Sequence, residues 1–217
     1  TLLGEPAPVD AATLAACVAG EHACRVGATL GVQVPRAAEL LGLVGRQASE
    51  LPCLPAGVCA GAGLGDAVRA KRAVKCEQAI AKAGAKLVNG ELKLVPKCAN
   101  AVLACLQLPN AKCATKSRAT CTKTQGKVDA LAGKLAAAVA KACEASGLAF
   151  ADVLDASGLG LVNLEAACGG AGVATLTNVA EATTCLAHYQ HCRARQLLEN
   201  QAPRLRELLG IGQLALP

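Results

Sequence analysis

Charged and apolar residues in the middle of the chain recur at the spacing of an α-helix. Lysines recur there in steps of four and then seven, so the pattern repeats every 11 residues. Eleven residues make three turns at about 3.67 residues per turn, which keeps the lysines on one face of a nearly straight helix. The two series are Lys71, Lys75, Lys82, Lys86, Lys93 and Lys97, then Lys112, Lys116, Lys123, Lys127 and Lys134. We therefore predict two long helices, each with a lysine face.

A short connection separates the two lysine series. Asp66 and Asn110 stand where the helices are expected to begin, and Asp and Asn are favoured N-caps. Long helices joined by a short turn lie antiparallel. Asn89, Gly90 and Pro96 disturb the first helix pattern, and we expect a kink or bulge there because proline lacks an amide hydrogen. The lysine period continues past these residues, so the helix should resume on the same axis.

Cysteines follow the same antiparallel register. The numbers of facing residues in an antiparallel hairpin add to a constant, and three cysteine pairs add to 218 or 219. A disulfide needs Cα atoms about 4.4–6.8 Å apart, which facing positions on close-packed helices provide. The predicted disulfides are Cys76–Cys143, Cys98–Cys121 and Cys105–Cys113. They would form a ladder of covalent links across the hairpin.

The two ends of the chain repeat one another at an offset of 168 residues. Each copy predicts a long helix with two cysteines seven apart, then a short helix with proline at its first position and glycine at its end. Asp10 and Asn178 are the expected N-caps of the two long helices. The matching residues are Cys17, Cys24, Arg25, Leu30, Pro35, Arg36, Glu39, Leu40, Leu41 and Gly42 in one copy and Cys185, Cys192, Arg193, Leu198, Pro203, Arg204, Glu207, Leu208, Leu209 and Gly210 in the other.

These patterns predict an all-α protein in which a long, disulfide-laddered antiparallel hairpin is flanked by two repeated units. Residues 1–45 form the N-terminal repeat unit, 46–66 a linker rich in Cys, Gly and Pro, 67–147 the lysine-striped hairpin and 148–217 the C-terminal repeat unit. Beyond the hairpin, the sequence leaves open the pairing of Cys17, Cys24, Cys53, Cys59, Cys168, Cys185 and Cys192. Because this set is odd, at least one thiol should be free or bonded to another molecule.

Composition bears on the core and on the compartment. The 217 residues include no Trp or Met and a single Phe and Tyr, so a core of alanine and leucine needs reinforcement. Thirteen cysteines without Cys-x2-Cys pairs favour disulfides in an oxidising compartment. We therefore expect an extracellular or periplasmic protein whose signal peptide has been removed. The sequence contains no run of about 18 apolar residues that would predict a membrane span.

Positive charge is concentrated in the hairpin. Residues 69–141 hold 15 basic and three acidic side chains, whereas residues 1–68 and 142–217 each carry a net charge of −3. Opposed charges suit contacts between copies, so we expect copies of the same chain as partners. The lysine face also suits a polyanion, although the lack of aromatic stacking platforms disfavours nucleic acid.

Several sequence contexts together resemble a known kind of protein. They are Lys75-Cys76, Ala79-Ile80-x-Lys82, Lys97-Cys98, the Cys105 and Cys113 turn, the alanine-rich helix to Cys143 and the ending Cys-x6-Cys-Arg followed by Pro-Arg-x2-Glu-Leu-Leu. Over most of its length the chain resembles uncharacterised, exported, cysteine-rich helical proteins of environmental bacteria. The resemblance implies export and disulfides, and it implies no activity, cofactor or catalytic residue.

Catalysis and metal binding have weaker support in the sequence. Since no nucleophile or acid–base pair stands in a context that forms a cleft, we expect no enzyme, no catalytic residue and no cofactor. His188 and His191 stand three apart on one predicted helix and would place two metal ligands on one face. A second hypothesis is copper sequestration by thiols, although no Cys-x3-Cys array is present. Our leading hypothesis is a non-catalytic secreted structural or interaction protein, such as a subunit of an extracellular fibre or surface assembly.

Overall fold

The structure, a computed structural model, describes residues 10–55 and 63–214. Every regular element in these two ranges is helical, which confirms the predicted all-α class. The long helices are α1 (Ala11–Gln33), α3 (Ala67–Gln107), α4 (Cys113–Val139) and α7 (Val179–Gln201). The short elements are α2 (Ala37–Leu43), η2 (Ala48–Glu50), η3 (Ala140–Glu144), α5 (Phe150–Leu154), η4 (Leu161–Leu164), α6 (Glu165–Cys168), η5 (Gly169–Ala171) and α8 (Leu205–Ile211).

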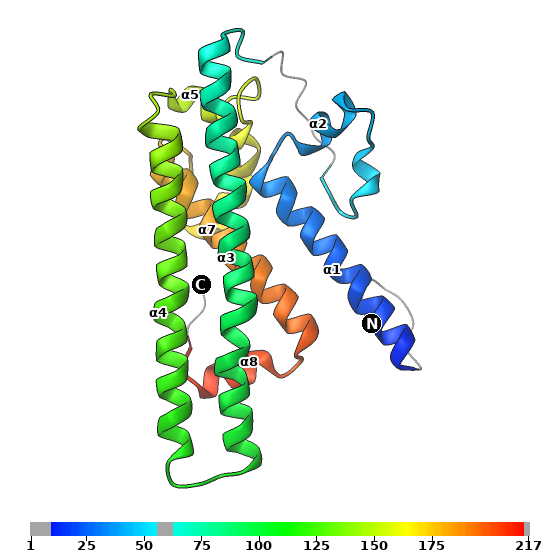
Figure 1. Cartoon of the computed structure of the whole chain (residues 1–217), viewed down its shortest axis with the longest axis vertical. Helices are drawn as coiled ribbons and strands as arrows, with labels where there is room; N and C mark the ends of the chain where they lie inside the picture. The colour runs from blue at the N-terminus through cyan, green and yellow to red at the C-terminus, as the bar shows by residue number, and fades with distance from the viewer. Residues whose placement is uncertain (1–9, 56–62, 215–217) are drawn as a thin grey trace.

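Helices α3 and α4 lie side by side along the long axis of the molecule and are joined by a short turn (Figure 1). Asp66 caps α3 as predicted, because its Oδ1 accepts a hydrogen bond from the Arg69 amide at 2.7 Å. The prediction that Asn110 caps α4 is wrong. Its side chain accepts from the Lys112 amide at 3.1 Å, and α4 begins at Cys113. Asn110 therefore stabilises the turn that precedes the helix.

The bulge expected near Gly90 and Pro96 of α3 does not form. The helix is continuous from Ala67 to Gln107, with Pro96 inside it, so the predicted bulge is wrong. Gly90 has a packing role instead, since a Cβ there would lie 2.3 Å from Cδ1 of Leu131 on α4. In the described part of the hairpin, the departure from α geometry is the π-helical turn η3, which follows α4 and carries Cys143. This turn has no signal in the apolar pattern of the sequence.

Three disulfides cross the hairpin. The outer rung, Cys76–Cys143, has a Cα–Cα distance of 4.7 Å. The middle rung, Cys98–Cys121, has a Cα–Cα distance of 4.6 Å. The inner rung, Cys105–Cys113, spans 5.3 Å between Cα atoms beside the turn. These are the pairs expected from the residue-number sums, and they show that α3 and α4 run antiparallel in register over their whole shared length.

The two end units repeat one another element for element. The bounds of α7 and α8 are those of α1 and α2 shifted by 168 residues. Asp10 and Asn178 cap α1 and α7 as predicted, each accepting from the amide three residues on. The expected positions of proline and glycine are wrong, because α2 and α8 begin two residues after Pro35 and Pro203 and include their glycines. Arg36 and Arg204 occupy the two N-cap positions, and each pairs with the glutamate three residues on.

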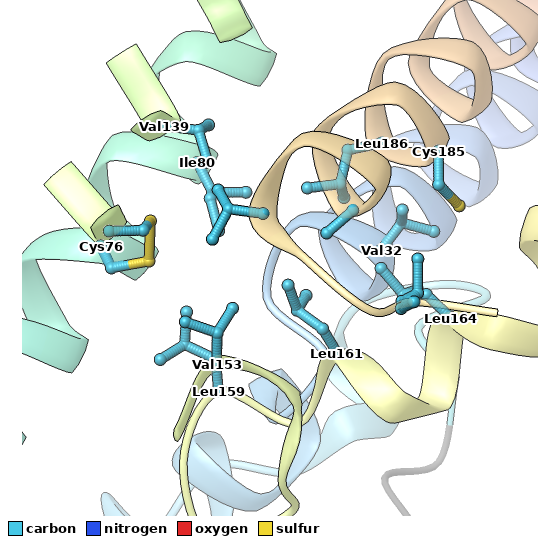
Figure 2. Close-up of a cluster of buried hydrophobic side chains, with 14 of the residues drawn as sticks. Val32, Cys76, Ile80, Val139, Val153, Leu159, Leu161, Leu164, Cys185 and Leu186 are labelled. Carbon is cyan, nitrogen blue, oxygen red and sulfur yellow. A yellow bond between two sulfur atoms is a disulfide. The ribbon is translucent and has the colours of Figure 1, made fainter. Parts of the chain in front are cut away.

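Helices α7 and α8 pack across the hairpin and enclose the core. Ile80 of α3, Leu161 of η4 and Leu186 of α7 are each at most 1% exposed and meet in the cluster of Figure 2. Fully burying such a side chain stabilises the fold by about 1.5–3 kcal/mol. Val95 of α3 and Leu205 of α8 belong to a second cluster, which contains the middle rung. Apolar contacts and disulfides therefore hold the same surfaces together.

Helix α1 runs antiparallel to α7 beside the core (Figure 1). Arg25 Nη1 donates to Gln196 Oε1 at 3.0 Å, and the ring Nε2 of His22 lies 3.2 Å from Gln201 Nε2. Among the described residues, no helix is both long and apolar enough to cross a membrane.

Replacing both cysteines of one rung with alanine should lower the free energy of unfolding in the order outer, middle, inner. Loop-closure entropy for separations of 67, 23 and 8 residues gives up to about 4.4, 3.4 and 2.5 kcal/mol respectively. The sulfurs of the outer and middle rungs belong to residues at most 1% exposed, so their loss also leaves cavities. Denaturant unfolding followed by circular dichroism measures the three losses. A larger loss for the inner rung than for the outer rung would contradict this order.

Candidate interaction surfaces

The predicted lysines all lie on the outside of the hairpin. Each of the eleven, from Lys71 to Lys134, is exposed, as is Lys141 in η3. In the residues that the structure describes, no lysine forms an ion pair with a carboxylate. The hairpin therefore presents positive charge that neighbouring side chains do not neutralise.

The cysteines outside the hairpin divide between two disulfides and two free thiols. Cys24–Cys53 and Cys168–Cys185 have Cα–Cα distances of 4.8 and 5.2 Å. Cys17 and Cys192 are free and half-buried. Cys59 lies outside the described residues. Thiols held in five disulfides are not available as soft copper ligands, which weakens the copper hypothesis.

The free thiols occupy related places in the repeat. The long helix of each unit carries two cysteines, and in α7 the first of them, Cys185, is bonded to Cys168. In α1 the second of them, Cys24, is bonded to Cys53. Cys17 is the counterpart of bonded Cys185, and Cys192 is the counterpart of bonded Cys24. Each unit thus lacks the bond that the other unit makes.

The turn that joins the long and short helices is the same in both units. Val34 and Ala202 end the long helices with φ and ψ of −133° and 80° and of −135° and 88°. Their amides donate to Leu30 O at 2.8 Å and to Leu198 O at 2.9 Å. Side chains that share a side of α7 and α8 therefore have counterparts that share a side of α1 and α2.

Counterparts of core residues are exposed on α1 and α2. Leu14 is 49% exposed whereas its counterpart Ala182 is 3% exposed. Val26 is 60% exposed whereas its counterpart Ala194 is fully buried. Leu40 is 40% exposed and its counterpart Leu208 is 4% exposed. We call Leu14, Val26 and Leu40 the open face, because each is exposed at a position that the other repeat unit buries.

The open face belongs to a part of the chain with balanced charge. Four charged residues, Glu21, Arg25, Arg36 and Glu39, lie in residues 11–43. Arg25 Nε donates to Glu21 Oε1 at 2.7 Å, and Arg36 Nε donates to Glu39 Oε2 at 2.9 Å. The bond from Arg36 holds the pKa of Glu39 below its ordinary value, so this carboxylate stays ionised and paired. Helices α1 and α2 therefore carry no net charge.

The histidines expected to bind metal have other surroundings. His191 is buried, and its Nδ1 makes a hydrogen bond with Glu91 Oε1 of α3. His188 is half-buried and lines, with His191, a cavity between α4 and α7. The described residues contain no group of three His, Cys, Asp or Glu side chains placed to hold a metal ion.

Comparison with known proteins adds no relative to this description. No protein-family model, no curated protein and no solved structure matches the chain. The argument about function therefore depends on the chain's own surfaces.

Sequence reasoning found the lysine face and missed the open face. The repeat was visible in the sequence, but which copy packs on the hairpin depends on tertiary contacts. The Glu91 and His191 pair was also missed, because the two residues are 100 positions apart and neither has a motif around it. The one available signal was Glu91 itself, a carboxylate within an apolar stretch of the first helix.

Replacing either member of the buried pair should destabilise the protein strongly. Glu91→Leu or His191→Leu leaves the other polar group buried without its partner, at a cost of about 3 kcal/mol or more. The double variant should recover a large part of the loss, because neither polar group then remains. Thermal and denaturant unfolding of all four proteins measures this coupling. Additive losses would show that the contact contributes nothing specific.

Proposed function

We propose that this chain is a non-catalytic, secreted structural protein that assembles with copies of itself through the open face. The observation that carries the proposal is the difference in burial between the two repeat units. Leu14, Val26 and Leu40 stand exposed at positions that the second unit buries. A contiguous patch of exposed large apolar side chains marks an interaction surface, and our proposal is that these residues belong to one.

Charge favours another copy of the chain as the partner. Two copies of the open face can meet without repulsion, because α1 and α2 carry no net charge. Two copies of the lysine face repel one another, since its charges are unpaired. A contact between identical faces about a two-fold axis is the commonest arrangement of protein dimers.

Packing disfavours the alternative in which α1 and α2 replace α7 and α8 on the hairpin of another copy. Gly212, just after α8, is pressed against the middle rung, and a Cβ there would lie 2.6 Å from Cys121 Sγ. Its counterpart in the first unit is Val44. A valine does not fit that place without moving the disulfide, so the open face needs a partner surface of another shape.

The free thiols supply covalent links for such an assembly. Cys17 lies one helical turn from Leu14, beside the open face. Cys192 lies on α7, so a second link would start from a different helix. Two links per chain join pairs of copies into a row, which is the arrangement of an extracellular fibre.

Disulfides support the expected location. Five of them occur in the described residues, which fits an oxidising environment outside the cytoplasm. Secretion is part of the proposal, and so is the absence of catalysis.

Self-association should depend on the open face. Leu14→Glu or Val26→Glu places a charge in the apolar contact, and we expect the dissociation constant to rise by about 100-fold or more. Size-exclusion chromatography with light scattering over a range of concentrations measures the mass. Leu108→Glu is the matched control, because Leu108 is 78% exposed at the hairpin turn and outside the repeat units. A wild-type chain that stays monomeric at all concentrations would refute the proposal.

The covalent links should be visible by electrophoresis without reductant. Oxidised wild-type protein should give a ladder of multimers that collapses to one band on reduction. Cys17→Ser and Cys192→Ser should each limit the ladder to dimers, and the double variant should run as a monomer. A ladder that persists in the double variant would show that other cysteines make the links.

A further inference from the structure

A groove runs along the hairpin between α3 and α4. Its described lining comes from these two helices alone and extends on α3 from Ala79 to Lys93. These 14 residue steps cover about 21 Å at 1.5 Å rise per residue. The groove has a volume of about 780 Å³. Sites for small molecules have volumes of about 300–1,000 Å³, so the groove is large enough for one.

The floor of the groove is apolar and built from small side chains with two leucines. It consists of Ala79, Ala83 and Gly90 on α3 and of Leu131, Leu135 and Ala138 on α4. Leu135 is buried, and the methyl groups of Leu131 reach across to Gly90. Alanines at the other positions leave the space above the floor unfilled.

Lysines form the rim. Lys82, Lys86 and Lys93 stand along α3, and Lys134 stands on α4. The antiparallel register places Lys134 opposite residue 85, because the numbers of facing residues add to 219 at the outer and middle rungs. Lys82, Lys86 and Lys134 therefore gather around one stretch of the groove. All four rim lysines are exposed, and no acidic side chain is among the described lining residues.

This combination selects the ligand by chemistry. A polyanion would contact the rim and leave the apolar floor wet. A neutral lipid would cover the floor and leave the ammonium groups without a partner. A molecule with one long apolar tail and one anionic head satisfies both, because lysine stems lie along apolar surface while their charged ends reach the head.

We propose that the groove binds a long-chain fatty acid. Its carboxylate is held by Lys82, Lys86 and Lys134, and its alkyl chain covers the floor formed by Gly90, Leu131 and their neighbours. The site lies on the hairpin and uses no residue of the open face, so the proposal is independent of self-association.

Titration calorimetry with hexadecanoate, added below its micelle concentration, tests the site. We expect saturable binding of one molecule per chain. Hexadecanol should bind at least tenfold more weakly because it has no charge, and acetate should not bind because it has no tail. Hexadecyl phosphate carries the same tail on a different anion. Tighter binding of the phosphate by tenfold or more would overturn the assignment to a fatty acid, and absence of saturation would overturn the site.

Variants separate the groove from the general charge of the hairpin. The triple variant Lys82→Gln, Lys86→Gln and Lys134→Gln should weaken hexadecanoate binding by about tenfold or more. The matched control is Lys112→Gln, Lys116→Gln and Lys123→Gln, which removes the same charge from the hairpin outside the groove. An equal loss in the control would show diffuse attraction and refute the site.

A groove-filling variant provides the second check. Ala83→Leu places a larger side chain above the floor and should abolish binding, while Ala114→Leu, at an exposed position of α4 outside the groove, should not. Circular dichroism and thermal unfolding show whether each variant is folded. If Ala83→Leu changes the mass in solution and leaves hexadecanoate binding intact, the groove is a contact between copies, and the proposal is wrong.

Discussion

Covalent links between α3 and α4 reinforce an interface whose buried apolar side chains are mostly valine and leucine, such as Leu87, Val128 and Leu135. The three rungs are nested, so each inner rung shortens the loop that the next rung closes. Their contributions to the free energy of unfolding therefore add to less than the sum of the separate values. Even so, the total is comparable to the whole net stability of a domain, about 5–15 kcal/mol. The remaining core forms where α7, α8 and short elements such as η4 pack on the two linked helices.

The same links hold together two helices whose charges repel. Helices α3 and α4 each carry a series of exposed lysines, so the two helices repel one another. At low ionic strength this repulsion would separate the helices if they were not linked. The closed disulfides prevent the two helices from separating, so the lysines stay close to one another despite their repulsion. The hairpin can therefore maintain a concentrated positive surface on one side while α7 and α8 bury its apolar side. Disulfides in this protein support both the fold and the surface chemistry.

Local patterns in the sequence predicted the elements well because their causes are local. The lysine period gave both long helices, side-chain caps at Asp10, Asp66 and Asn178 fixed three helix starts, and the residue-number sums pointed to the rungs. What failed depended on contacts across the fold. The sequence suggested that Gly90 is a turn residue, whereas in the structure it lies within α3 and Leu131 packs against it. The lysine rim was predictable, whereas the hollow beneath it depends on which small residues face one another across the hairpin.

The two repeat units show which features the local sequence determines and which it does not. Their helices correspond in bounds, caps and turn geometry, but side chains at equivalent positions differ in size. Leu14 and Val26 are bulkier than their buried counterparts Ala182 and Ala194, while Val18 and Ala37 are smaller than Leu186 and Leu205. Close-packed interfaces require matched shapes. A unit in which some side chains are larger and others smaller therefore does not fit the surface that its copy covers. The first unit therefore shares the backbone of the second unit but does not match the surface of the hairpin on which the second unit packs.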